Sequence, residues 1–143
     1  MGKRRRAREA ALSILYQLEF HPGKLEELLR SFWAEGPPTS EVQTFSEELV
    51  RGVLEHGEKI DALITKYAEH WSLPRIALVD RNILRLATYE LLFRKEIPEK
   101  VILNEAIEIA KLYGSEDSGR FVNGILDRIR TVTRPDLLEP AGR

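Results

Sequence analysis

Apolar residues recur at intervals of three and four along almost the whole of this 143-residue chain, and this periodicity constrains the fold more than any other feature. Such spacing places the apolar side chains on one face of an α-helix. No segment shows the alternating apolar and polar pattern, bounded by turn residues, that is typical of strands. The sequence therefore predicts an all-α protein of about seven helices.

Turn residues divide this pattern into segments. Proline and glycine interrupt it at positions 22–23, 36–38, 57, 74 and 98, and both residues end helices. We expect helices over residues 4–19, 24–35, 78–93 and 98–113 and from 115 to about 130. A further helix is expected from residue 40 to a kink or break at Gly57, and another from there to about residue 70. Ser40 with Gln43 resembles a capping box, Gly114 is expected to follow a helix C-terminus, and Ser115 to cap the last helix. Segment 78–93 is apolar on nearly two faces, so we expect it at the centre of the fold.

The irregular stretch between residues 56 and 74 separates two groups of helices. We expect one domain, residues 1–143, built of two small packed helical subdomains over about 3–56 and 57–132, with a loose tail over 133–143. No apolar run reaches the length of about 18 residues that suggests a membrane span. The basic N-terminus is not followed by the apolar segment of a secretory signal. We therefore expect a cytoplasmic protein.

The net charge of −1 hides a strong asymmetry along the chain. The first eight residues hold five basic side chains and no acidic one, which leaves 17 basic and 23 acidic side chains, a net charge of −6, on the rest. The basic residues are Lys3, Arg4, Arg5, Arg6 and Arg8. Arginines packed this densely repel one another unless an anion lies nearby, and arginine suits phosphate and base contacts. The pattern indicates nucleic-acid binding, with a frayed, solubilising terminus as the alternative.

Catalytic chemistry finds little support in the sequence. There is no cysteine, the three histidines at positions 21, 56 and 70 are scattered, and no phosphate-binding loop, dinucleotide fingerprint, zinc-protease or serine-hydrolase motif occurs. Adjacent acids such as Glu47-Glu48 fall on the polar faces of expected helices. No enzyme activity, cofactor or metal is predicted.

A second candidate region lies around residues 113–121. Tyr113 and Phe121 flank a polar turn that contains Asp117. Single-stranded RNA is recognised by aromatic stacking and polar contacts beside positive charge. Phe121 also fits a core position and Asp117 also fits a helix start, and Asn123 fits a structural role as well as an RNA contact. Those alternatives stay open.

Several motifs resemble the NusB family of bacterial transcription antitermination factors (N utilization substance protein B). They are Arg4-Arg5-Arg6-Ala7-Arg8-Glu9-Ala10-Ala11, Leu15-Tyr16-Gln17, the stretch Asp80 to Leu91, Ile97-Pro98, Asn104-Glu105-Ala106, Ala110-Lys111 and Phe121 to Asp127. They follow one another in the family's order from about residue 3 to 131. The resemblance implies an all-helical adaptor that binds single-stranded boxA RNA of ribosomal RNA operon leaders. It further implies NusE, a small-subunit ribosomal protein, as the partner in the RNA polymerase antitermination complex.

The resemblance also implies site residues. By position, the RNA-contacting residues are Lys3, Arg4, Arg5, Arg8, Tyr113, Asp117 and Phe121, and the residues facing NusE are Tyr67 and Asp80. Residues 41–69 carry seven acids and three bases, a net charge of −4 that suits a basic ribosomal protein. The alternative is a protein-interaction or self-association module, in which a homodimer covers the arginine-rich helix.

Overall fold

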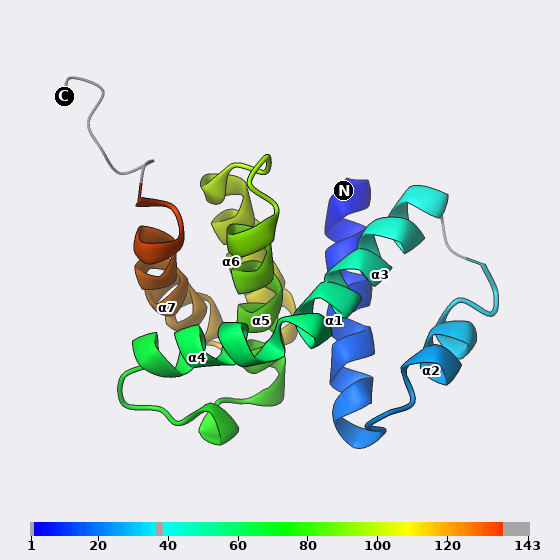
Figure 1. Cartoon of the computed structure of the whole chain (residues 1–143), viewed down its shortest axis with the longest axis horizontal. Coiled ribbons are helices and arrows are strands. Elements are labelled where there is room, and N and C mark those ends of the chain that lie inside the picture. The colour runs from blue at the N-terminus through cyan, green and yellow to red at the C-terminus, as the bar shows by residue number, and fades with distance from the viewer. Residues whose placement is uncertain (1, 37–38, 136–143) are drawn as a thin grey trace.

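The computed structural model describes residues 2–36 and 39–135, and over these residues it contains seven α-helices, one short 3₁₀ turn and no strand (Figure 1). The elements are α1 (Lys3–Phe20), α2 (Leu25–Phe32), α3 (Ser40–Glu55), α4 (Gly57–Tyr67), η1 (Leu73–Arg75), α5 (Leu78–Phe93), α6 (Glu99–Tyr113) and α7 (Ser118–Thr133). The prediction of an all-α fold is confirmed. Within the described ranges no helix is both long and apolar enough to cross a membrane.

Helix α5 lies at the centre. It packs against α1 and α3 on one side and against α4, α6 and α7 on the other, as Figure 1 shows. Ten of its sixteen residues are buried, including Leu84 and Leu91, which are fully enclosed. The two apolar faces seen in the sequence therefore serve two sets of neighbours.

The break between α3 and α4 falls where the sequence places it, with α3 ending at Glu55 and α4 beginning at Gly57. A single buried cluster nevertheless runs through both groups of helices, from Leu15 and Val50 to Ile64 and Leu126. The division into two subdomains stays a prediction, since α5 joins both groups through one continuous core.

Some helix ends differ from the prediction by a few residues. Thr39, not Ser40, caps α3, because its Oγ1 accepts a hydrogen bond of 3.2 Å from the amide of Val42. Helix α7 begins at Ser118 rather than Ser115, since the intervening residues form a turn in which the Ser115 amide donates to Ser118 Oγ at 2.8 Å. Gly114 has extended backbone, with φ of −96°, and not the left-handed conformation expected after a helix.

The start of the predicted tail is firmly held. Thr133 still belongs to α7, and Arg134 is buried. The Arg134 guanidinium donates to the carbonyls of four residues at 2.6 to 3.2 Å: Glu90, Leu91, Arg94 and Ile97. The prediction of a loose tail is thus wrong for these two residues, and residues 136–143 lie outside the described part.

Candidate RNA and partner interface

The arginine-rich start of α1 is divided by burial. Lys3, Arg4 and Arg6 are exposed, Arg5 is partly buried, and Arg8 is buried. The sequence pattern does not distinguish these five cations, but only Lys3, Arg4 and Arg6 present their charge to solvent. The face of α1 that packs on the core decides the difference.

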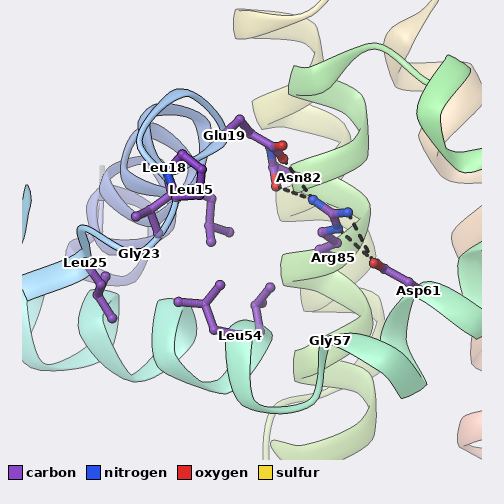
Figure 2. A pocket seen from close by; sticks show the side chains of 12 residues that line it. Leu15, Leu18, Glu19, Gly23, Leu25, Leu54, Gly57, Asp61, Asn82 and Arg85 are labelled. Atoms are coloured by element: carbon purple, nitrogen blue, oxygen red, sulfur yellow. Dashed lines mark hydrogen bonds and ion pairs between the residues drawn. The ribbon is translucent and has the colours of Figure 1, made fainter.

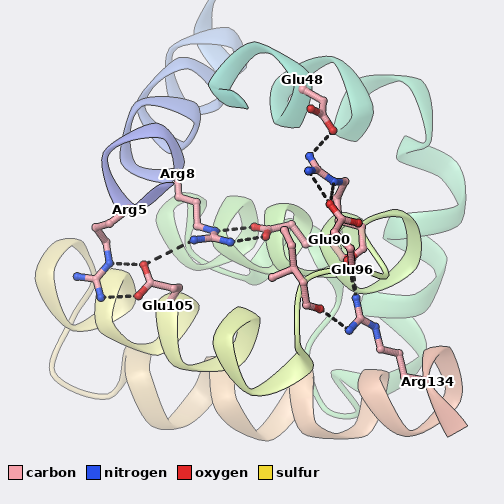
Figure 3. A network of polar contacts seen from close by, with 9 residues as sticks. Arg5, Arg8, Glu48, Glu90, Glu96, Glu105 and Arg134 are labelled. Carbon is pink, nitrogen blue, oxygen red and sulfur yellow. Dashed lines mark hydrogen bonds and ion pairs between the residues drawn. The ribbon is translucent and has the colours of Figure 1, made fainter. Parts of the chain in front are cut away.

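Arg8 is paired inside the protein (Figure 3). Its Nε and Nη2 donate to the two carboxylate oxygens of Glu90 on α5, at 2.9 and 2.7 Å, and Arg8 and Glu90 are 5% and 2% exposed. A buried guanidinium requires a partner of opposite charge, and a bidentate carboxylate supplies it. Arg8 therefore holds α1 to α5, and its predicted contact with RNA has no support in this geometry.

Arg5 makes the second of these pairs. It donates through Nε and Nη2 to both carboxylate oxygens of Glu105 on α6, the second bond measuring 2.8 Å. The hydrogen bond from Arg5 holds the pKa of Glu105 below its ordinary value, and the same bond raises the pKa of Arg5. Arg5 is therefore largely neutralised at the edge of the surface.

Three cations remain accessible on the first turn of α1. Lys3 makes an exposed ion pair of 2.9 Å with Glu41, a kind of pair that contributes little and is readily exchanged. The Arg4 guanidinium lies 4.0 Å from the ring centroid of Phe45, which orients it while its edge stays in solvent. Arg6 is exposed.

Exposed aromatic residues lie on another side of α1 and at the end of α6, and of the three accessible cations only Arg6 is near them around the helix axis. Tyr113, at the end of α6, is 51% exposed, and its pKa is raised by burial and then by the neighbouring Glu9 carboxylate. Helix geometry places Glu9, Tyr16 and Phe20 within about 60° of one another around α1. The exposed rings of Tyr16 and Phe20 lie 5.4 Å apart.

The sequence-based prediction does not include Tyr16 and Phe20 as site residues. A signal for them was available, because an aromatic pair spaced by four residues lies opposite the apolar stripe of α1. Such a pair on a polar face has no core to fill.

Asp117, Phe121 and Asp80 surround one cavity of about 310 Å³ between the η1 region, α5 and α7. Phe121 packs partly against the core and meets Trp71 edge-on, with 6.2 Å between the ring centroids. Asp117 is exposed at the start of α7 and makes no capping bond. Asp80 is buried, and its Oδ1 has no hydrogen-bond partner among the described residues. The structure thus places Asp80, the expected NusE contact, on the same cavity as Asp117 and Phe121, the expected RNA contacts.

Tyr67 lies elsewhere. It lines a different cavity, formed with Leu63, Leu92 and Val132, and its carbonyl accepts a bond of 2.9 Å from Arg128. Tyr67 and Asp80 therefore do not share a pocket. Asn123 is exposed on α7, and within the described ranges no three histidine or acidic side chains are arranged to hold a metal ion.

The sequence of this chain is similar to those of known proteins. The model of the NusB family matches residues 5–131. The chain is 50% identical over 137 residues to the transcription antitermination protein NusB of Geobacter sulfurreducens, which covers 95% of this chain and 99% of the relative. It is 54% identical over 130 residues to NusB of Desulfitobacterium hafniense strain DCB-2, covering 88% of this chain and 86% of the relative.

Solved structures agree with the sequence relatives. A crystal form of T. maritima NusB superposes with a TM-score of 0.82 at 49% identity, covering 90% of each chain. A complex of the antitermination factors NusB and NusE with double-stranded RNA has a chain that superposes with a TM-score of 0.83 at 31% identity, covering 92% of this chain and 98% of that one.

Proposed function

Because this chain belongs to the NusB family of transcription antitermination proteins, we propose that it binds single-stranded boxA RNA of ribosomal RNA operon leaders together with NusE, within the RNA polymerase antitermination complex. Family membership confirms the interpretation of the chain as a non-enzymatic protein. The remaining questions are which side chains meet the RNA and which meet the partner.

The observation that carries the RNA proposal is the exposed first turn of α1. Lys3, Arg4 and Arg6 are accessible there, although the chain as a whole is slightly acidic. These cations neutralise phosphates and so supply affinity without reading sequence. Arg5 and Arg8 hold this turn in position, because their carboxylate partners fix α1 on α6 and α5.

The exposed aromatic residues supply the base contacts. Tyr113, Tyr16 and Phe20 offer exposed ring faces beside Glu9, on the side of α1 that Arg6 approaches, and stacking on such rings contributes roughly 1–3 kcal/mol per base. Asp117 and Phe121 extend this surface around the turn between α6 and α7. The carboxylate of Asp117 accepts a hydrogen bond from a base amino group and disfavours phosphate.

The partner proposal rests on Asp80. A buried carboxylate oxygen without a hydrogen-bond donor is costly, and Asp80, which carries one, lines a cavity together with Asp117. A lysine or arginine of NusE entering this cavity would satisfy that oxygen. Tyr67, which lines a different cavity, is proposed as an outlying contact of the same partner.

The test measures binding of a boxA oligonucleotide by fluorescence anisotropy from 50 to 500 mM salt, with and without NusE. Three neutralised phosphates give a slope of log affinity against log salt of about −2, at about −0.7 per contact for single strands. A scrambled single strand and a boxA duplex are the controls, the duplex because the related complex contains double-stranded RNA.

The proposal fails if the scrambled strand binds as tightly as boxA or if the salt slope is near zero. Tighter binding of the duplex would transfer the activity to double-stranded RNA. Light scattering provides a further check, because a homodimer that RNA does not dissociate would support the self-association alternative.

A further inference from the structure

Several arginines of this fold are held in place by carboxylates. Figure 2 shows one of them beside a cavity of about 380 Å³ between α1, α3 and α5. There Arg85 donates to both oxygens of Asp61 at 2.9 and 3.2 Å and to Glu19 at 2.9 Å. The two inner arginines of α1 are held in the same way. A carboxylate fixes a guanidinium but also neutralises it, so an arginine held in this way offers little to an RNA phosphate.

Arg4 is held differently, by an aromatic ring. Its guanidinium carbon lies over the ring of Phe45 on α3, 4.0 Å from the ring centroid, and Phe45 is 6% exposed. Among the residues that the structure describes, no carboxylate forms an ion pair with Arg4. The two acids that line the same cavity as the ring, Glu41 and Glu48, pair with other cations. A ring orients a cation without cancelling its charge.

Two carboxylates sense the charge of Arg4 without pairing with it. The hydrogen bond from Lys3 is the main reason that the pKa of Glu41 is lowered. The hydrogen bond from Arg94 lowers the pKa of Glu96 in the same way. Arg4 is the smallest contributor in both cases. These carboxylates therefore belong to other cations, and the charge of Arg4 remains available.

The Phe45 ring has three guanidiniums around it. Arg94 and Arg8 lie 5.1 and 5.5 Å from its centroid. Both are neutralised, Arg8 by the buried Glu90 and Arg94 by two acids nearer the surface, so they repel Arg4 only weakly. Because the ring belongs to the buried core, its own position is fixed, and it gives Arg4 a fixed support.

The outer side of Arg4 is open. Lys3, Arg4 and Phe45 line a cavity of about 280 Å³, which the side chains of Ser40 and Thr44 also border. Arg4 is exposed there. The N–H donors of a guanidinium lie in its plane, so a guanidinium that rests on a ring through its face keeps donors for a phosphate at its edges.

We propose that Phe45 is a positioning residue of the RNA site: it does not touch the RNA but holds Arg4 with its charge uncancelled and its donors ready for a phosphate. This role rests on the RNA binding proposed above. An arginine loses much rotamer freedom when it is fixed. A ring that orders Arg4 before RNA arrives therefore reduces the entropy that is lost on binding.

The first experiment measures the affinity of the full-length protein for a boxA single strand, and its salt slope, by fluorescence anisotropy. Phe45→Leu keeps an apolar side chain but removes the ring, and affinity should fall about two- to fivefold, the equivalent of one exposed cation–π contact. The salt slope should stay unchanged, because the charge of Arg4 remains. Phe45→Tyr keeps the ring and should bind like wild type. Phe32→Leu, the same change at a partly buried ring of α2, is the matched control and should leave the affinity unchanged.

A double-mutant cycle identifies the cation through which the ring acts. In the Arg4→Ala background, Phe45→Leu should have no further effect on RNA affinity. An equal loss in both backgrounds would overturn the proposal, because the ring would then act only through the packing of α3. A loss caused equally by Phe32→Leu would overturn it for the same reason.

Proton–nitrogen NMR of the free protein tests the contact without RNA. The Arg4 Nε–H resonance, identified by its loss in Arg4→Ala, should be shifted upfield by the Phe45 ring, relative to that of the exposed Arg6 on the same turn. The absence of this shift from the wild-type spectrum would overturn the proposal, even if Phe45→Leu does not fold. A wild-type protein that binds no single strand would overturn the RNA function and this role with it. RNA binding that Phe45→Leu leaves unchanged would overturn the positioning role alone.

Discussion

Arg4 and Arg8 lie one turn apart on α1 and have opposite environments. Arg4 rests against Phe45 at the surface, and Arg8 reaches Glu90 in the interior. The motif glutamates at positions 90 and 105 acquire a physical role from this difference, since each accepts two hydrogen bonds from an arginine of α1. Part of an apparent RNA-binding motif thus orients the helix.

Glu90→Gln should destabilise the protein strongly. It removes the bidentate counter-charge of the buried Arg8 guanidinium, which keeps only the Glu105 carboxylate 3.8 Å away, and breaking a buried pair costs about 3–5 kcal/mol. Urea denaturation measures the free energy of unfolding. Glu41→Gln, which removes only the exposed pair with Lys3, is the control and should change it little. Nearly equal stability of the two variants would mean that the Arg8–Glu90 pair does not hold α1 in place.

Glu105 should make stability depend on pH in the acid range. Its folded-state pKa is lowered from 4.5 by the hydrogen bond from Arg5, so the unfolded chain takes up protons first as pH falls. The contribution is complete above the unfolded pKa of about 4.5 and is lost as pH falls through the lower folded value. Denaturation between pH 7 and 3 should show a smaller loss for Glu105→Gln than for wild type. Glu108→Gln, an exposed change on the same helix, should follow the wild type.

At the scale of elements, glycine and arginine set how closely helices meet and how they end. Gly52 lies in α3 where the Tyr89 ring of α5 leaves no room for a side chain. Arg134 donates to three carbonyls at the end of α5 and just after it, those of Glu90, Leu91 and Arg94. Both contacts tie α5 to elements distant in sequence.

Gly52→Ala should destabilise the protein despite alanine's higher helix propensity. An added Cβ would lie 2.2 and 2.4 Å from two ring atoms of Tyr89, and overpacking of this kind costs about 1–3 kcal/mol. Gly124→Ala is the matched control: a Cβ there meets no atom within 4 Å, so it should stabilise α7 by about 0.5–1 kcal/mol. Thermal unfolding measures both effects: the midpoint should fall for Gly52→Ala and rise for Gly124→Ala. A stabilising Gly52→Ala would show that Tyr89 moves aside freely.

On the scale of the whole molecule, charge is separated along the chain. The basic first turn of α1 stands against a body with a net charge of −6. A polyanion is attracted to one region and repelled from much of the rest. The asymmetry therefore orients RNA as well as binding it.

Replacing Arg4 and Arg6 together by alanine should weaken RNA about equally for all sequences, because phosphate contacts carry no sequence information. The salt slope should become shallower by about 1.4, or 0.7 per lost contact. Filter binding of boxA and scrambled strands measures both quantities. Arg30→Ala with Lys66→Ala removes the same charge from exposed sites on α2 and α4 and should have a much smaller effect. Equal losses in the two double variants would indicate only a change in net charge.

The sequence by itself determined the helices and the family. Periodicity and turn chemistry act over a few neighbouring residues, so the centre of each helix, the break at position 57 and the central place of α5 follow from local order. The ends of α3 and α7 were less exact, since caps depend on single hydrogen bonds such as that of Thr39.

The tertiary structure decided which polar side chains are available. Arg8 and Arg5 meet partners 82 and 100 residues away, and Asp80 and Asp117 meet across a cavity between separate elements. Gly52 fits because of a ring 37 positions later in the chain. Burial and pairing arise only when distant segments pack. For that reason the sequence of the first eight residues does not reveal which of its five basic side chains reach solvent.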